Sequence, residues 1–140
     1  MRALAVLTLA VLALGACGGS DDGRDLRITL VVEDKNIRVE DSQCAGARPF
    51  QYVHAQAGFE LEDDAGKAVA DGELPSGRAV NADPTIDWGV DRIPTFCVFD
   101  LELDDVPRRD RYSLRLGEGS ALPFDASFVE GGKPVTLTLR

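Results

Sequence analysis

The chain has 140 residues, 44% of them hydrophobic, with 15 Lys and Arg against 24 Asp and Glu and a formal net charge of −9. A chain of this length is expected to fold as one domain around a single core. Its acidic character excludes nucleic acid from the expected partners, because the phosphate backbone repels negative charge.

The first 16 residues have the layout of a secretory signal peptide. Arg2 supplies one positive charge, and the run from Ala3 to Ala16 contains a single polar side chain, Thr8. A charged start, an apolar middle and small residues at the end are typical of a segment that is cleaved during export. The run is shorter than the ~20 apolar residues that span a bilayer. We therefore expect residues 1–16 to be removed.

A cysteine follows the signal peptide directly. The sequence Leu14-Gly15-Ala16-Cys17 resembles the bacterial lipobox, in which a leucine and two small residues precede the cysteine. The resemblance implies that a diacylglyceryl group is attached to the Cys17 sulfur, and two acyl chains hold a protein durably on a membrane. Residues 17–25 are then the lipidated cysteine and a flexible linker at the outer face of the bacterial cell membrane. The alternative is an ordinary signal peptide with a coincidental cysteine.

Residues 26–140 alternate apolar and polar side chains, which is typical of half-buried strands. The longest alternating runs are LRITLVVE, FCVFDLELD, RYSLRL and PVTLTLR, and their inward residues are expected to be Leu26, Ile28, Leu30, Val32, Cys97, Phe99, Leu101, Leu103, Tyr112, Leu114, Leu116, Val135, Leu137 and Leu139. Shorter strands are predicted at 36–40, 50–55, 58–62, 67–74 and 121–129. No stretch has a helical period, so the predicted fold is all-β, an antiparallel β-sandwich of the immunoglobulin-like or transthyretin-like Greek-key kind.

Two structural features are expected within this sandwich. With Cys17 lipidated, Cys44 and Cys97 remain as an even pair in an exported chain, where disulfides persist. A redox pair is the alternative, but the C-x-x-C spacing is absent. Tyr112 follows Asp110 by two residues, a placement that fits either a tyrosine corner or a plain core aromatic.

Several short motifs resemble those of a group of secreted actinobacterial lipoproteins. They are Gln43-Cys44-Ala45-Gly46, the hairpin ELEDDAGKAVADGEL, the strand Pro94 to Phe99, and a Val-Pro pair followed by YSLRL. The resemblance covers about residues 26–140. It implies the sandwich, the anchor and the disulfide, and it implies no particular activity.

The sequence lacks the signals of an enzyme or a metal centre. His54 is the only histidine and lies in an alternating stretch, and no G-x-S-x-G motif is present. Carboxylates are dense at 62–64 and 71 and again at 83–91, but none matches a calcium-binding loop. We expect no catalytic residues, no cofactor and no metal, and we interpret these carboxylates as a solvated acidic face.

Residues 75–94 form the one segment that does not fit a simple scaffold. They are predicted to be a long connection, and such loops in compact domains are disproportionately functional. The candidate contact residues are the only tryptophan and the charged side chains around it, Trp88, Asp83, Asp87, Asp91 and Arg92. The alternative is that Trp88 closes over the edge of the sandwich as a lid. Outward strand residues are expected to be scattered charges without an aromatic cluster.

The sequence therefore favours a membrane-anchored, extracytoplasmic binding module. Its expected partner is an unknown envelope protein or glycan, and it is expected to be a monomer. One alternative is an envelope glycan hydrolase that uses carboxylates of the 75–94 segment. Another is a structural envelope protein without a specific ligand.

Overall fold

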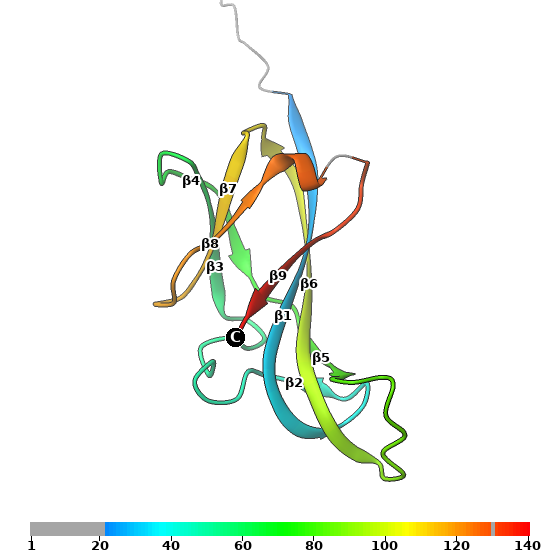
Figure 1. Ribbon diagram of the computed structural model, residues 1–140. Helices are drawn as coiled ribbons and strands as arrows, with labels where there is room; N and C mark the ends of the chain where they lie inside the picture. Colours follow the sequence, from blue (N-terminus) through cyan, green and yellow to red (C-terminus); the bar gives the residue numbers. More distant parts are fainter. Residues whose placement is uncertain (1–21, 130) are drawn as a thin grey trace, which may run out of the picture.

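The computed structural model describes residues 22–129 and 131–140 (Figure 1). The predicted signal peptide and Cys17 lie outside the described residues. Within them, helical structure is limited to the short 3-10 helix η1 (Ala126–Val129), and no helix is long and apolar enough to cross a membrane.

The described residues form two β-sheets that pack into a sandwich, as predicted. Sheet A has the strand order β2 (Gln43–Cys44), β5 (Gly77–Asn81), β6 (Arg92–Pro107), β1 (Gly23–Val39) and β9 (Val135–Leu139). Sheet B has the order β4 (Ala68–Glu73), β3 (Gly58–Asp63), β7 (Arg111–Leu116) and β8 (Leu122–Asp125). Neighbouring strands are antiparallel except β1 and β9, which pair in parallel.

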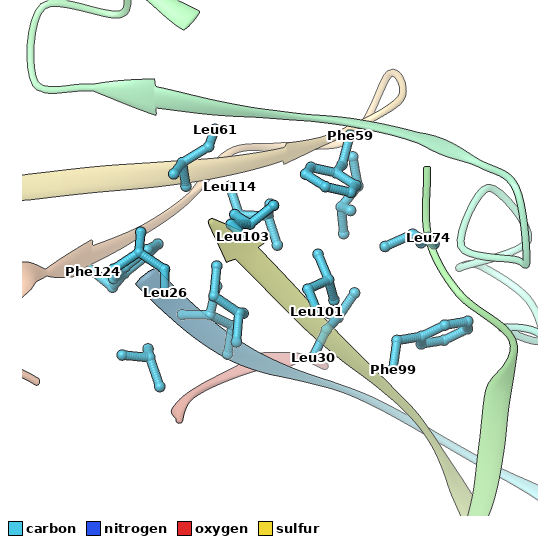
Figure 2. Close-up of a cluster of buried hydrophobic side chains, with 14 of the residues drawn as sticks. Leu26, Leu30, Phe59, Leu61, Leu74, Phe99, Leu101, Leu103, Leu114 and Phe124 are labelled. Carbon is cyan, nitrogen blue, oxygen red and sulfur yellow. The ribbon is translucent and has the colours of Figure 1, made fainter. Parts of the chain in front are cut away.

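The core lies between the two sheets. Figure 2 shows Phe59, Leu61 and Leu114 of sheet B facing Leu26 and Leu101 of sheet A. All the residues predicted to face inward along the four long runs are buried. Burying such side chains is the main favourable term in folding, at roughly 1.5–3 kcal/mol each. The period-two alternation therefore identified the inward faces correctly.

Three of the shorter predicted strands differ in the structure. Residues 36–40 do not form a separate strand, because β1 continues to Val39 past an irregularity between Val32 and Asn36. Residues 50–55 form turns rather than a strand, and the Val53 N–H donates to the Phe50 carbonyl across 2.9 Å. Residues 121–129 divide into β8 and η1.

Strands β1 and β6 run the length of the molecule as one long ribbon (Figure 1). Gly23 pairs with Pro107 at one end, and Val39 pairs with Arg92 at the other. With 17 residues in β1 and about 3.3 Å per residue, the ribbon extends roughly 50 Å. The two ends of β1 therefore lie at opposite ends of the protein.

The predicted disulfide is present and crosses β5. Cys44 of β2 is bonded to Cys97 of β6, with their Cα atoms 5.9 Å apart. Gly77 of β5 lies beneath the bridge, and a Cβ at this position would come within 2.7 Å of the Cys97 Sγ and of the Cys44 carbonyl oxygen. Only glycine therefore fits between the two cysteines.

Tyr112 forms a tyrosine corner and is also a core aromatic. Its hydroxyl donates to the Pro107 carbonyl at 2.8 Å and accepts from the Arg109 N–H at 3.0 Å. The ring is buried and stacks on Phe124 with a centroid distance of 5.5 Å. The two interpretations of this residue thus describe the same side chain.

Candidate functional site

The segment predicted as a long loop at 75–94 is shorter in the structure. Its first part forms β5, and its last part, from Arg92, belongs to β6. The connection that remains spans residues 82–91 and projects from the lower end of the ribbon (Figure 1). The prediction was wrong at both boundaries because GRAV pairs with β2 and β6, and RIP pairs with the end of β1.

Local hydrogen bonds shape this connection. Asp83 accepts from the Thr85 hydroxyl at 2.6 Å and from the Thr85 N–H at 3.1 Å, and these bonds lower its pKa. Asp87 accepts from the N–H of Gly89, whose positive φ of 62° suits glycine. The Ala82 N–H donates to the Pro94 carbonyl of β6. The segment is therefore a sequence of defined turns.

Trp88 combines features of the two roles predicted for it, a contact residue and a lid over the edge of the sandwich. Its side chain is partly buried, and its indole N–H donates to the Asn81 side-chain oxygen at 3.3 Å. Trp88 and the buried Ile93 help to line an open depression of about 310 Å³. The indole thus covers the end of the ribbon in part and leaves the rest of its surface accessible.

Exposed apolar side chains gather around the same end of the ribbon. The large hydrophobic residues most exposed among the described residues are Ile37 (46%), Val39 (45%), Ile86 (43%) and Val90 (65%). Ile37 and Val39 come from the end of β1, and the other two come from the 82–91 connection. We call these four residues, together with Trp88, the tip.

A buried ion pair supports the tip from beneath. The Arg38 guanidinium contacts both carboxylate oxygens of Asp34, at 3.0 and 2.6 Å, and the Asp34 side chain is fully buried. Arg38 also donates to the Ala45 carbonyl and to the Thr95 hydroxyl, which joins β1 to the 45–47 segment and to β6. The Ala47 N–H donates to Asp34 as well. These bonds fix the direction in which the end of β1 leaves the sandwich.

The same network sets the ionisation of Asp34. Burial raises the pKa of this carboxyl, but the hydrogen bonds from Arg38 and from the Ala47 N–H lower it by more. The net pKa lies below its ordinary value of 3.8, so Asp34 is charged in the folded protein at neutral pH.

The charged residues predicted for the site have different roles. Asp83 is engaged in its own turn with Thr85. Asp87 and Asp91 are exposed and line the depression beside Trp88, together with Glu40. Arg92 lies on β6, opposite Val39, and donates to the Ile37 carbonyl at 3.2 Å. The structure therefore brings Trp88, Asp87 and Asp91 together at the depression, whereas Asp83 does not line it.

The sequence reasoning missed the apolar part of the tip. Ile86 and Val90 lie within residues 75–94, where the predicted contact residues were the tryptophan and the charged side chains. Ile37 and Val39 were assigned to a strand, and their position beside the 82–91 connection depends on the pairing of β1 with β6. Two alternating β-branched residues on one face at the end of a strand, followed by turn residues, were the available signal.

The other candidate groups are engaged elsewhere. His54 is exposed in a turn, where its Nδ1 lies 2.8 Å from the Ala55 carbonyl. Glu62 binds Arg115 at 2.8 and 3.0 Å, and these bonds lower its pKa. Asp63 accepts from the Lys67 N–H of the β3–β4 turn, which lowers its pKa too. In the described part of the chain, no three His, Cys, Asp or Glu residues gather as a metal site.

No protein-family model, curated protein or solved structure matches this chain.

Proposed function

We propose that this protein is a membrane-anchored extracytoplasmic lipoprotein that binds a partner in the cell envelope through its tip. The proposal combines an anchor at Cys17, based on its resemblance to the lipobox, with a contact surface at the tip. One observation supports it most: the most exposed large apolar side chains gather at the end of the ribbon that lies farthest from Gly23.

This arrangement suits presentation of a surface away from a membrane. A chain anchored just before residue 22 would hold the Gly23 end of the ribbon near the bilayer. The tip would then lie roughly 50 Å farther out along β1. Acidic residues would keep the rest of the domain away from anionic headgroups.

The composition of the tip is that of a protein contact surface. Trp88 offers a large flat ring with one polar atom, which is the kind of side chain that contributes most at interfaces. Ile86 and Val90 line the same depression as Trp88, while Ile37 and Val39 lie at the end of β1, and exposed apolar side chains gathered in this way mark interaction sites. Asp87, Asp91 and Glu40 add a polar rim.

A site-specific photocrosslinker tests the contact surface in the native envelope. Val90, the most exposed of the tip residues, is replaced by p-benzoyl-phenylalanine in the full-length chain. The matched control places the same crosslinker at Glu60, which is exposed on sheet B. We expect a discrete adduct from position 90 only, and its loss when Trp88→Ala is added. Equal capture at both positions would contradict the proposal.

The anchor is tested separately by membrane fractionation. Cys17→Ser should move the protein from the membrane fraction to a soluble or uncleaved form, because no diacylglyceryl group can then be attached. Cys44→Ser, which leaves the lipobox intact, is the control and should stay with the membrane. Unchanged detergent-dependent membrane association of Cys17→Ser would exclude a lipid anchor at this residue.

A further inference from the structure

The outward face of sheet A carries an apolar stripe that the tip does not include. Val31 of β1 pairs with Val98 of β6, and Val80 of β5 pairs with Phe96 of β6. Paired residues share a face, and this face is opposite to that of the buried Cys97. All four side chains are only partly buried. We call Val31, Val80, Phe96 and Val98 the outer stripe.

An apolar outward face is unusual for a sandwich. The outward side chains of antiparallel sheets commonly face water and are polar. Here the stripe continues along β6 to Pro94, which pairs with Ile37 of β1. Val39 follows on the same face of β1. Contiguous apolar surface that is only partly covered in this way marks an interaction site. The expectation of outward strand residues as scattered charges was therefore wrong for sheet A.

The charges around the outer stripe balance one another. Four arginines and five carboxylates lie at outward strand positions or strand ends of sheet A: Arg27, Arg78, Arg92, Arg140, Asp25, Glu33, Asp100, Glu102 and Asp104. Arg27 contacts Glu102 at 3.9 Å, and Arg140 contacts Glu33 at 3.3 Å. Asp100 accepts from the Thr29 hydroxyl. This face is close to neutral in a chain whose net charge is −9.

The near-neutral charge of this face indicates which kind of partner binds to it. Two copies of an acidic chain repel each other across most of their surfaces, and the repulsion is weakest where each surface is neutral. A two-fold contact also requires a self-complementary patch, such as a flat apolar strip flanked by both charge signs. We infer that the outer stripe is a homodimer interface, in which the outward faces of two copies of sheet A pack against each other.

The size and symmetry of the face fit this inference. The two long strands β1 and β6 and the five-residue strands β5 and β9, spaced about 4.8 Å apart, give roughly 600 Å² of outward surface. Specific stable interfaces bury at least about 1,200 Å² in total, or about 600 Å² from each partner, so this face reaches the lower end of that range. A two-fold axis parallel to β1 places both Gly23 ends on the same side, so both copies can be anchored in one membrane.

Molecular mass measured across a concentration series tests the interface. The full-length protein is solubilised in detergent, and its protein mass is determined by sedimentation with the detergent matched out. We expect a dimer, and Phe96→Asp should raise the dimer dissociation constant roughly tenfold to a hundredfold, because it buries a charge at the centre of the contact. Ser113→Asp, on the outward side of sheet B, is the control and should leave the dimer unchanged.

A crosslinker at Val80 identifies what the stripe contacts in the envelope and does not depend on the folding of Phe96→Asp. In the native envelope, p-benzoyl-phenylalanine at Val80 should give an adduct of twice the chain mass whose peptides all come from this chain. An adduct with a different protein would overturn the inference, and so would a monomeric mass at all concentrations. Neither result bears on the capture from Val90, so the two proposals fail independently.

Discussion

On the outward face of sheet A, the central strand positions carry three valines and a phenylalanine, whereas the corresponding positions of sheet B carry charged side chains. Sheet B presents five carboxylates and two arginines on this side: Glu60, Glu62, Asp71, Glu73, Asp125, Arg111 and Arg115. Sheet A is close to neutral, and sheet B is acidic. Both sheets need an apolar inward face to form the core, so their outward faces record what each sheet meets outside it. Sheet B is suited to water, and sheet A is suited to a protein surface.

The largest contrast between the sheets concerns their ion pairs. Asp34→Asn in sheet A should lower the free energy of unfolding by about 3–5 kcal/mol, because Arg38 is left buried without its charged partner. The matched variant Glu62→Gln in sheet B breaks a pair whose arginine side chain is 42% exposed, against 11% for Arg38, so its effect should be smaller. Urea unfolding of both variants measures the difference. Equal losses would show that the buried network does not support the tip.

Acid unfolding should follow from the same network. The pKa of Asp34 is lowered in the folded protein, so its ionised form stabilises folding above the ordinary value of 3.8. This contribution is lost as the pH falls through the folded pKa. The unfolding free energy of the wild type should therefore decline below about pH 4, and Asp34→Asn should flatten that part of the profile. An unchanged slope in the variant would assign the acid sensitivity to other carboxylates.

The disulfide cross-links sheet A alone, so its reduction should separate the two sheets in hydrogen exchange. We expect reduction to lower stability by about 2–4 kcal/mol, since the bridge closes a long loop in the unfolded chain. Exchange should increase first in β2 and in β5, which lies between the two bonded cysteines, while β7 with its tyrosine corner keeps its protection. Uniform acceleration over both sheets would indicate that they open as one unit.

Trp88→Ala should have a moderate effect that distinguishes the tip from the core. Loss of one hydrogen bond and of partial burial should cost about 1–2 kcal/mol, because the ring is not enclosed. Tyr112→Ala, which empties a buried aromatic site, is the comparison and should cost about 3–5 kcal/mol. Thermal unfolding of the two variants ranks them. A loss at Trp88 as large as that at Tyr112 would make it a lid rather than a contact residue.

The smallest expected effect is on exposed positions of the two regions. Val90→Ser at the tip and Glu60→Ser on sheet B should each change stability by no more than about 0.5 kcal/mol, because neither side chain is packed. Only Val90→Ser should weaken capture of an envelope partner. Loss of capture by both variants would show that the effect is not specific to the tip.

The inward faces were predictable from the sequence, and the outward stripe was not. Alternation assigns one face of a strand to the core, and Leu30, Val32, Cys97 and Phe99 follow it. The same rule assigns the residues between them to the solvent-facing side, whether those residues are polar or apolar. Val31 extends the apolar run LVV, and Phe96 and Val98 make FCVF continuous. A strand that is apolar on both sides was visible there, but a period-two search counts only one side.

The remaining errors concern pairings between distant segments. β2 has two residues and β5 has five, so neither carries a strong periodic signal, and both depend on pairing with β6 or with each other. The parallel pairing of β1 with β9 joins the two ends of the domain and has no local signature. The tip combines the end of β1 with the 82–91 connection, which lies more than forty residues later in the sequence. Its tryptophan was identifiable, but its neighbours were not.

The long strand β1 has a mechanical consequence. It is held along its length by β6 on one side and, over Ile28–Val32, by β9 on the other. A pull on the chain at Gly23, directed along the strand, loads these hydrogen bonds in shear, so that many must break together rather than one after another. The same strand ends at the tip, so tension from a bound partner passes along β1, beside the central strand β6 of sheet A. The sandwich is therefore expected to resist extension along the direction from Gly23 to the tip.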